Sequence, residues 1–111
     1  MTLAVVKWLF FMEGVLFGAL GVPLALGHVP PNDSYGFRTA KTLSDPRVWY
    51  EINQVIGVDL IIAGFLIGSA ALLFDLVRTQ SVAILALLNV AFQAVVLLLI
   101  LLHGFVKLRG I

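Results

Sequence analysis

A single polar segment, residues 35–53, interrupts a chain in which 61% of the residues are hydrophobic and only 12% are charged. Its most versatile side chain for recognition is Arg38. The planar guanidinium can donate five hydrogen bonds, which suits a carboxylate, a phosphate or a group of backbone carbonyls. Thr39 and Thr42 carry hydroxyls that can cap a helix or bond the neighbouring backbone. This segment is the first candidate for a binding site.

Three further residues follow at helical spacing. Trp49, Asn53 and Gly57 are each four residues apart, so on a helix they share one face. Gly36, beside Tyr35, permits a positive φ or a close backbone approach. Two interpretations stay open. These residues either anchor a helix at headgroup depth and fold the loop over the helix ends, or they form a ligand or partner site.

A second group of polar residues lies inside apolar runs. Glu13 and Asp59 are carboxyls at positions where an ionised Asp costs about 2.5–3.5 kcal/mol. Asn89 and Gln93 share a helix face by their spacing of four, and His103 returns to within about 40° of Asn89 at 100° per residue. The carboxyls should therefore be protonated, paired or in contact with water.

Close packing of the helices predicts that the polar groups of the membrane interior meet near mid-depth, with His103 beside Asn53 and the polar segment. Carboxyls and histidine in such a row can form a proton or ion path. The alternative is interhelical hydrogen bonding, with each bond contributing about 0.6–2 kcal/mol to holding the bundle together. Both interpretations stay open for Glu13 and Asp59, whereas Asn89 and Gln93 favour the second.

The elements that position these residues follow from composition. A mean hydropathy of +1.10 over 111 residues predicts one transmembrane domain, residues 1–111, embedded in a lipid bilayer. Apolar runs predict spans at about 3–26, 50–74 and 82–105, and the absence of ten-residue alternation favours helices over a barrel. The fold class is therefore all-α, a transmembrane three-helix bundle with a polar loop between the first two spans.

Local signals refine the spans. Ser44 or Asp45 before Pro46 predicts that the second helix begins near Pro46, before its apolar run. The length of the first apolar run, with Glu13 inside it, indicates a true span rather than a secretory signal. Glycines four residues apart in the first two spans predict close helix approach, within one chain or between copies of a homo-oligomer.

Basic residues predict the orientation. Arg38, Lys41 and Arg47 lie in the first loop, on the same side as Lys107 and Arg109 near the C-terminus. The positive-inside rule places the polar loop and the C-terminus in the cytoplasm and the N-terminus outside.

The order of the loop residues resembles the signature of the SdpI family, immunity-protein-like small multi-pass proteins of the bacterial inner membrane. The matching positions are Tyr35, Gly36, Arg38, Thr39, Thr42, Trp49, Asn53 and Gly57. The family's namesake confers immunity to a secreted toxin made during sporulation delay. The resemblance runs from roughly Asn32 through the third span, and it implies a protective or regulatory binding role for the loop.

Several function classes are not expected. A net charge of +1 does not suggest a nucleic-acid partner, and the lack of cysteine excludes thiolate metal sites and cysteine nucleophiles. No nucleotide-binding or hydrolase motif is present, so we expect no enzyme, no metal and no cofactor. Three hypotheses remain: a loop that binds a peptide toxin, a lipid or a cytoplasmic regulator; a proton- or ion-coupled transporter or channel using Glu13 and Asp59; and a structural subunit of a membrane assembly.

Overall fold

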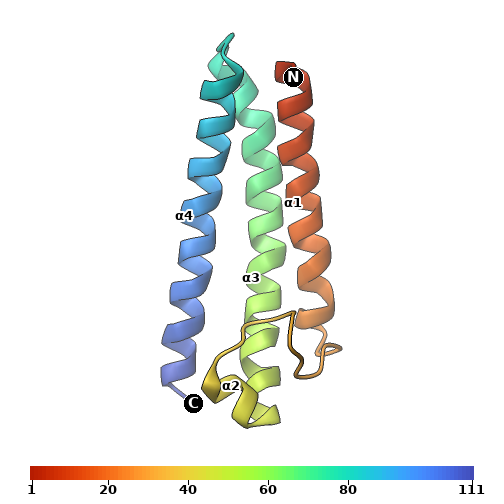
Figure 1. Cartoon of the computed structure of the whole chain (residues 1–111), viewed down its shortest axis with the longest axis vertical. Helices are drawn as coiled ribbons and strands as arrows, with labels where there is room; N and C mark the ends of the chain where they lie inside the picture. The colour runs from red at the N-terminus through yellow and green to blue at the C-terminus, as the bar shows by residue number, and fades with distance from the viewer.

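The structure, a computed structural model, describes residues 1–111, and all of its regular secondary structure is helical. Three long helices lie side by side, and Figure 1 shows α3 between α1 and α4. The elements are α1 (Leu3–Ala25), α2 (Ala40–Ser44), α3 (Pro46–Leu73), η1 (Phe74–Val77) and α4 (Val82–Arg109). The three long helices are long and apolar enough to cross a membrane. The all-α, three-span prediction is thereby confirmed.

Each long helix begins at a side-chain cap. Thr2 accepts a hydrogen bond from the Val5 amide at 3.1 Å, and Ser81 accepts one from the Ile84 amide at 3.2 Å. Asp45 accepts from the Arg47 amide at 2.9 Å, with Pro46 in the first turn of α3. These bonds satisfy amides that have no partner within the helix. The predicted start of the second helix at Pro46 is confirmed, and of the two candidate caps, Ser44 and Asp45, the helix uses Asp45.

The two ends of the bundle differ in composition. The N-terminus and the α3–α4 turn lie at one end, and the C-terminus lies at the other with the motif loop, residues 26–45 (Figure 1). Lys7 on α1 and Asp75 form an ion pair at 3.5 Å at the N-terminal end. The molecule measures 50 Å along its longest axis. That length spans a bilayer of about 40–45 Å with its headgroups.

Glycines set the distance between α1 and α3. A Cβ on Gly14 would lie 2.7 Å from the Gly64 carbonyl oxygen, and one on Gly57 would lie 2.2 Å from the Ala25 amide nitrogen. The two backbones are therefore in direct contact, as small residues allow between membrane helices. The predicted glycine contacts are made within one chain.

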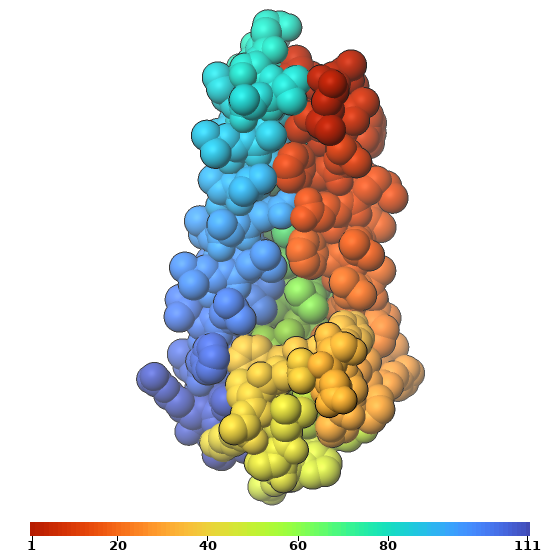
Figure 2. All heavy atoms as spheres, in the orientation of Figure 1, coloured from red at the N-terminus to blue at the C-terminus, as the bar shows by residue number.

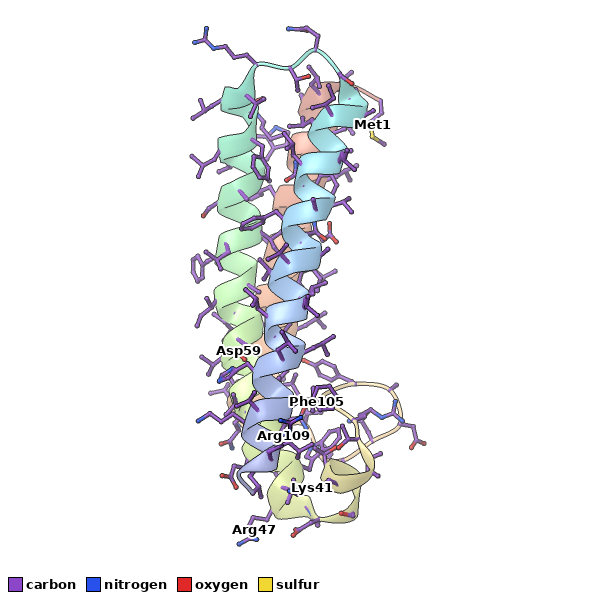
Figure 3. All side chains as sticks on the ribbon, turned by 90° about the vertical axis from the view of Figure 1, so that its left-hand side faces the viewer. Met1, Lys41, Arg47, Asp59, Phe105 and Arg109 are labelled. Carbon is purple, nitrogen blue, oxygen red and sulfur yellow. The ribbon has the colours of Figure 1, made fainter.

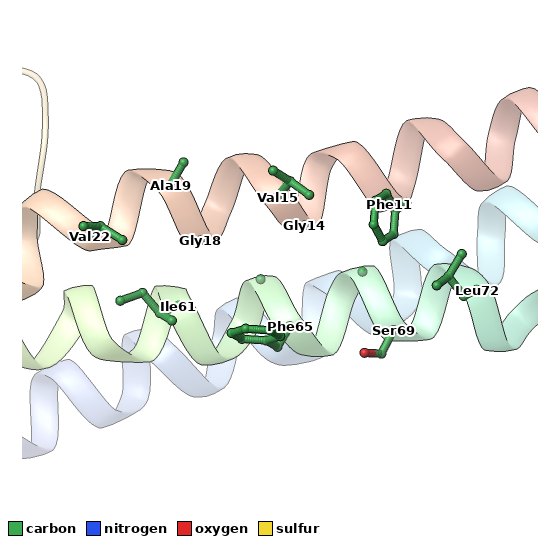
Figure 4. Close-up of a pocket in the computed structure, with 12 residues that line it drawn as sticks. Phe11, Gly14, Val15, Gly18, Ala19, Val22, Ile61, Phe65, Ser69 and Leu72 are labelled. Atoms are coloured by element: carbon green, nitrogen blue, oxygen red, sulfur yellow. The ribbon is translucent and has the colours of Figure 1, made fainter.

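A groove of about 380 Å³ follows this contact on the outer surface, as Figure 4 shows. It is lined by Phe11, Gly14, Val15, Gly18, Ala19, Val22, Ile61, Gly64, Phe65, Gly68, Ser69 and Leu72. The Gly18 backbone lies close to Gly64, but a Cβ on Gly18 would point into open space and meet no atom within 4 Å.

Large apolar side chains cover the outside of the three helices. Phe65 is 75% exposed and Leu87 is 68% exposed. Figure 2 shows the motif loop covering the space between α1 and α4 at the C-terminal end, whereas the helices above it lie open to their surroundings. An apolar exterior of this kind suits a lipid solvent and is rare on soluble proteins.

The main apolar core lies at the loop end. It consists of Phe37, Val48, Ile52, Ile56 and Leu108. The ring of Phe37 packs over Gly104 on α4, where a Cβ would come within 2.8 Å of the ring, and it meets Phe105 edge-on at 5.1 Å. A residue of the loop thus joins α3 to α4.

The glycine contact yields a test with a matched control. Gly57→Ala should lower the unfolding free energy by about 1–3 kcal/mol, because the new methyl overlaps the α1 backbone and overpacking costs this much. Gly18→Ala adds the same methyl into open space and should change stability little. Titration of the detergent-solubilised protein with sodium dodecyl sulfate, followed by circular dichroism, measures both. Equal effects of the two substitutions would contradict the backbone contact.

Candidate functional site

The motif loop begins with a turn built on Asn32. Its side-chain oxygen accepts hydrogen bonds from the amides of Ser34 at 2.9 Å and Tyr35 at 2.7 Å. Its side-chain nitrogen donates to the carbonyls of Pro30 at 2.8 Å and Tyr35 at 2.9 Å. Such bonds from a short side chain to nearby backbone groups take the place of the backbone hydrogen bonds that a helix would supply. Asn32 therefore fixes the backbone of residues 30–35 through four hydrogen bonds of its side chain.

The next two residues bring the loop against the helices. The Tyr35 hydroxyl donates to the Leu20 carbonyl on α1, and partial desolvation raises the pKa of Tyr35. Gly36 has a φ of 121°, which side chains rarely tolerate. A Cβ on it would also lie 2.8 Å from Asn53 Oδ1 and 2.9 Å from the Trp49 ring. The glycine is thus required by both its conformation and its contacts, as the sequence suggested.

Asn53 holds the backbone of Phe37. Its Oδ1 accepts from the Phe37 amide at 2.6 Å, and its Nδ2 donates to the Trp49 carbonyl at 3.0 Å. The Phe37 carbonyl accepts from the hydroxyl of Thr42 at 3.0 Å. Asn53 is 2% exposed and Thr42 is fully buried. The buried backbone N–H and C=O of Phe37, which lie outside regular secondary structure, therefore both have a hydrogen-bond partner.

Thr39 and Thr42 also begin the short helix α2. Thr39 Oγ1 accepts from the Thr42 amide at 3.1 Å, and Thr42 Oγ1 accepts from the Thr39 amide at 2.8 Å. This reciprocal pair is a capping box. Capping by these hydroxyls was predicted from the sequence, whereas the helix itself was not.

Lys41 connects α2 to the end of α4. Its Nζ donates to the carbonyl oxygens of Leu108 at 2.8 Å and Ile111 at 2.6 Å. Figure 3 shows Lys41 beside the C-terminal end of α4. A cation at this position meets the unpaired carbonyls and the negative end of the helix dipole. The contact of Lys41 with α4 was not predicted from the sequence, because its partners are more than sixty residues away in the chain.

Trp49 lies under the loop. It is fully buried, and its Nε1 donates to the Val29 carbonyl at 2.8 Å. Gly57, one turn beyond Asn53, packs against α1. The shared face of Trp49, Asn53 and Gly57 is therefore buried, and it packs against the loop and α1.

Arg38 is the exposed member of the motif. Its Nε donates to the Asn32 carbonyl at 3.0 Å, which fixes the plane of the guanidinium. Neither terminal nitrogen of the guanidinium makes a hydrogen bond or an ion pair within the chain. Arg38 can therefore present two parallel N–H groups to a carboxylate or a phosphate.

Comparison with protein families matches residues 28–106 to the model of the SdpI/YfhL protein family. The chain belongs to this family. The match contains the motif loop, α3 and most of α4, whereas α1 lies before it. No curated protein and no solved structure matches the chain. The resemblance drawn from the loop residues is thereby confirmed.

The intramembrane polar residues of this SdpI/YfhL protein form separate pairs. Glu13 on α1 accepts a hydrogen bond from Gln93 on α4 at 2.8 Å. Asp59 on α3 and His103 on α4 are joined by a 2.6 Å contact between Oδ2 and Nδ1. Asn89 is buried and bonds to the Leu85 carbonyl of its own helix.

These pairs differ from the single cluster that the sequence suggested. Gln93 and His103 are ten residues apart, which places them about 15 Å apart along α4 and about 80° apart around it. Gln93 therefore faces α1, and His103 meets Asp59 on α3 rather than Asn53 on the same helix. Each carboxyl has an amide or imidazole partner on another helix, which favours interhelical bonding over a continuous proton path.

Proposed function

We propose that this SdpI-like membrane protein has a protective or regulatory binding role, and that its motif loop recognises a negatively charged group through Arg38. The ligand class is a peptide, a lipid or a cytoplasmic protein that carries a carboxylate or phosphate. The observation that carries this proposal is the exposed guanidinium, with Nε bonded to the Asn32 carbonyl and both terminal nitrogens free. The planar fork suits such an oxyanion.

The rigidity of the loop supports this role. Arg38 follows Phe37, whose amide and carbonyl are both bonded to buried side chains, and it precedes the capping box of α2. A side chain on such a support loses less conformational freedom on binding than one on an open loop. The buried motif residues thus position Arg38 and do not themselves meet a ligand.

The loop end of the bundle is also its basic end. The seven lysines and arginines divide unequally between the two ends. Arg38, Lys41, Arg47, Lys107 and Arg109 lie at the loop end, and Lys7 and Arg78 lie at the other. We infer that the loop and the C-terminus face the cytoplasm of the bacterial cell and that the N-terminus is outside. The surplus of positive charge would also attract an anionic ligand.

Survival of cells exposed to the secreted toxin that the family's namesake neutralises tests the binding role. Expression of the chain should protect a sensitive host, and Arg38→Ala should reduce that protection at equal membrane abundance. Loss of a charge-assisted contact costs about 1.5–3 kcal/mol, which is tenfold or more in affinity. Arg38→Lys keeps the positive charge but lacks the two parallel N–H donors of the guanidinium, so it should protect only weakly.

Arg47→Ala provides the control, because Arg47 is exposed at the same end and its side chain has no partner in the chain. It should protect as the unaltered protein does. Failure of every variant to protect would contradict the protective role. Full protection by Arg38→Ala would contradict the assignment of binding to Arg38.

The orientation can be tested directly, since the chain has no cysteine of its own. Single cysteines at the exposed positions Asp33, in the loop, and Gln80, in the α3–α4 turn, would mark the two ends. In spheroplasts, a membrane-impermeant maleimide should label Gln80→Cys and should reach Asp33→Cys only after lysis. The reverse labelling pattern would place the loop outside.

A further inference from the structure

Two adjoining cavities lie on the outer surface of α3 and α4. One, a wide-open depression of about 590 Å³, is lined by the polar side chains of Glu51, Gln54 and Lys107 together with Asp59 and His103, and by three apolar residues. The other, of about 270 Å³, is a groove that begins at the same Asp59 and His103 and continues between apolar side chains of both helices. The two cavities therefore form one path with a polar end and an apolar end.

The path is separate from the motif loop. Figure 3 shows Asp59 on one side of the bundle and the loop on the other. Along α3, Glu51 lies about 12 Å nearer the loop end than Asp59, and Leu66 lies about 10 Å farther from it. The polar end therefore lies toward headgroup depth, and the groove runs toward the middle of the membrane.

The polar end carries unpaired charges of both signs. Glu51 and Lys107 are exposed and line the same cavity, yet neither makes a side-chain hydrogen bond or an ion pair within the chain. At the junction of the cavities, Asp59 is bonded to His103 Nδ1, and the other ring nitrogen of His103 has no partner in the chain. Both a cationic and an anionic group on one ligand could find a partner here.

The apolar end is shaped for a hydrocarbon chain. Ile62, Leu66 and Leu99 form its exposed walls, and Ala63, a small buried residue, forms part of its floor. The groove opens directly toward the surrounding lipid, so an acyl chain can enter it sideways without crossing polar surface. Such a ligand keeps its chain in the hydrocarbon and its headgroup near the interface.

We propose that this path binds a zwitterionic phospholipid with a primary ammonium headgroup, of the phosphatidylethanolamine type. The ammonium would bond to the Glu51 carboxylate and the phosphate to Lys107, while one acyl chain would lie between Ile62, Leu66 and Leu99. An anionic headgroup without an ammonium would leave the unpaired Glu51 carboxylate with no cation on the ligand to bond. This site involves no residue of the motif loop, so it stands apart from the function proposed for Arg38.

Native mass spectrometry of the full, delipidated chain in detergent tests the site with three lipid probes of equal chain length. Phosphatidylethanolamine should bind about tenfold more tightly than phosphatidylcholine, whose quaternary ammonium cannot donate a hydrogen bond, and than phosphatidylglycerol, which lacks a cation. Glu51→Gln and Lys107→Gln should each weaken phosphatidylethanolamine binding by about tenfold, the cost of one charged contact.

Two further variants keep the result decisive. Leu99→Trp should fill the groove and weaken binding of all three lipids while leaving the fold intact, because Leu99 is 59% exposed. Arg47→Gln removes a charge at the same end of the bundle but outside both cavities and should change nothing. Equal affinity for the three lipids, a preference for phosphatidylglycerol, or binding unaffected by Glu51→Gln and Lys107→Gln would overturn the proposal.

Discussion

The backbone N–H and C=O of Phe37 are the constraint on which the loop end of the bundle depends. Phe37 must be buried for its ring to join α3 to α4, and burial takes its amide and carbonyl away from water. Asn53 supplies an acceptor to the amide, and Thr42 supplies a donor to the carbonyl. An unsatisfied buried peptide group would cost about 1–3 kcal/mol for each atom without a partner. The conformation of the whole loop follows from meeting this requirement.

Much of the family motif can be explained by this one requirement. Gly36 lets the chain come close enough to Asn53 and Trp49, and Thr39 fixes Thr42 through the capping box. Trp49 is bonded to Val29 and covers the inner side of the loop. Arg38 is the motif residue that faces outward with unused donors. The structure thus separates the residues that build the support from Arg38, whose terminal nitrogens have no partner in the chain.

The sequence predicted what depends on composition and local spacing. The three spans follow from apolar runs, the start of α3 follows from Asp45 and Pro46, and the shared face of Trp49, Asn53 and Gly57 follows from their spacing. The pairing of polar residues between helices did not follow, because it depends on how each helix is rotated and tilted.

Asp59 and His103 illustrate the difference. They are forty-four residues apart, and no local signal indicates that His103 faces α3 while Gln93, on the same helix, faces α1. Lys41 at the end of α4 and Phe37 over Gly104 depend on tertiary packing in the same way. The glycine spacing predicted close helix approach, but it did not say which helices would meet.

Amide hydrogen exchange at Phe37 tests the central claim most directly, namely that Asn53 holds the Phe37 N–H inside the bundle. In the unaltered protein, the Phe37 amide should be protected to about the same degree as the helical amides of α3. Asn53→Ala should lower that protection by tenfold or more, because local opening would then cost less by about 1.4 kcal/mol or more. Gln54→Ala, at an exposed neighbouring position, should leave the protection unchanged. Exchange at the rate of an open loop in the unaltered protein, or protection unchanged by Asn53→Ala, would contradict the account.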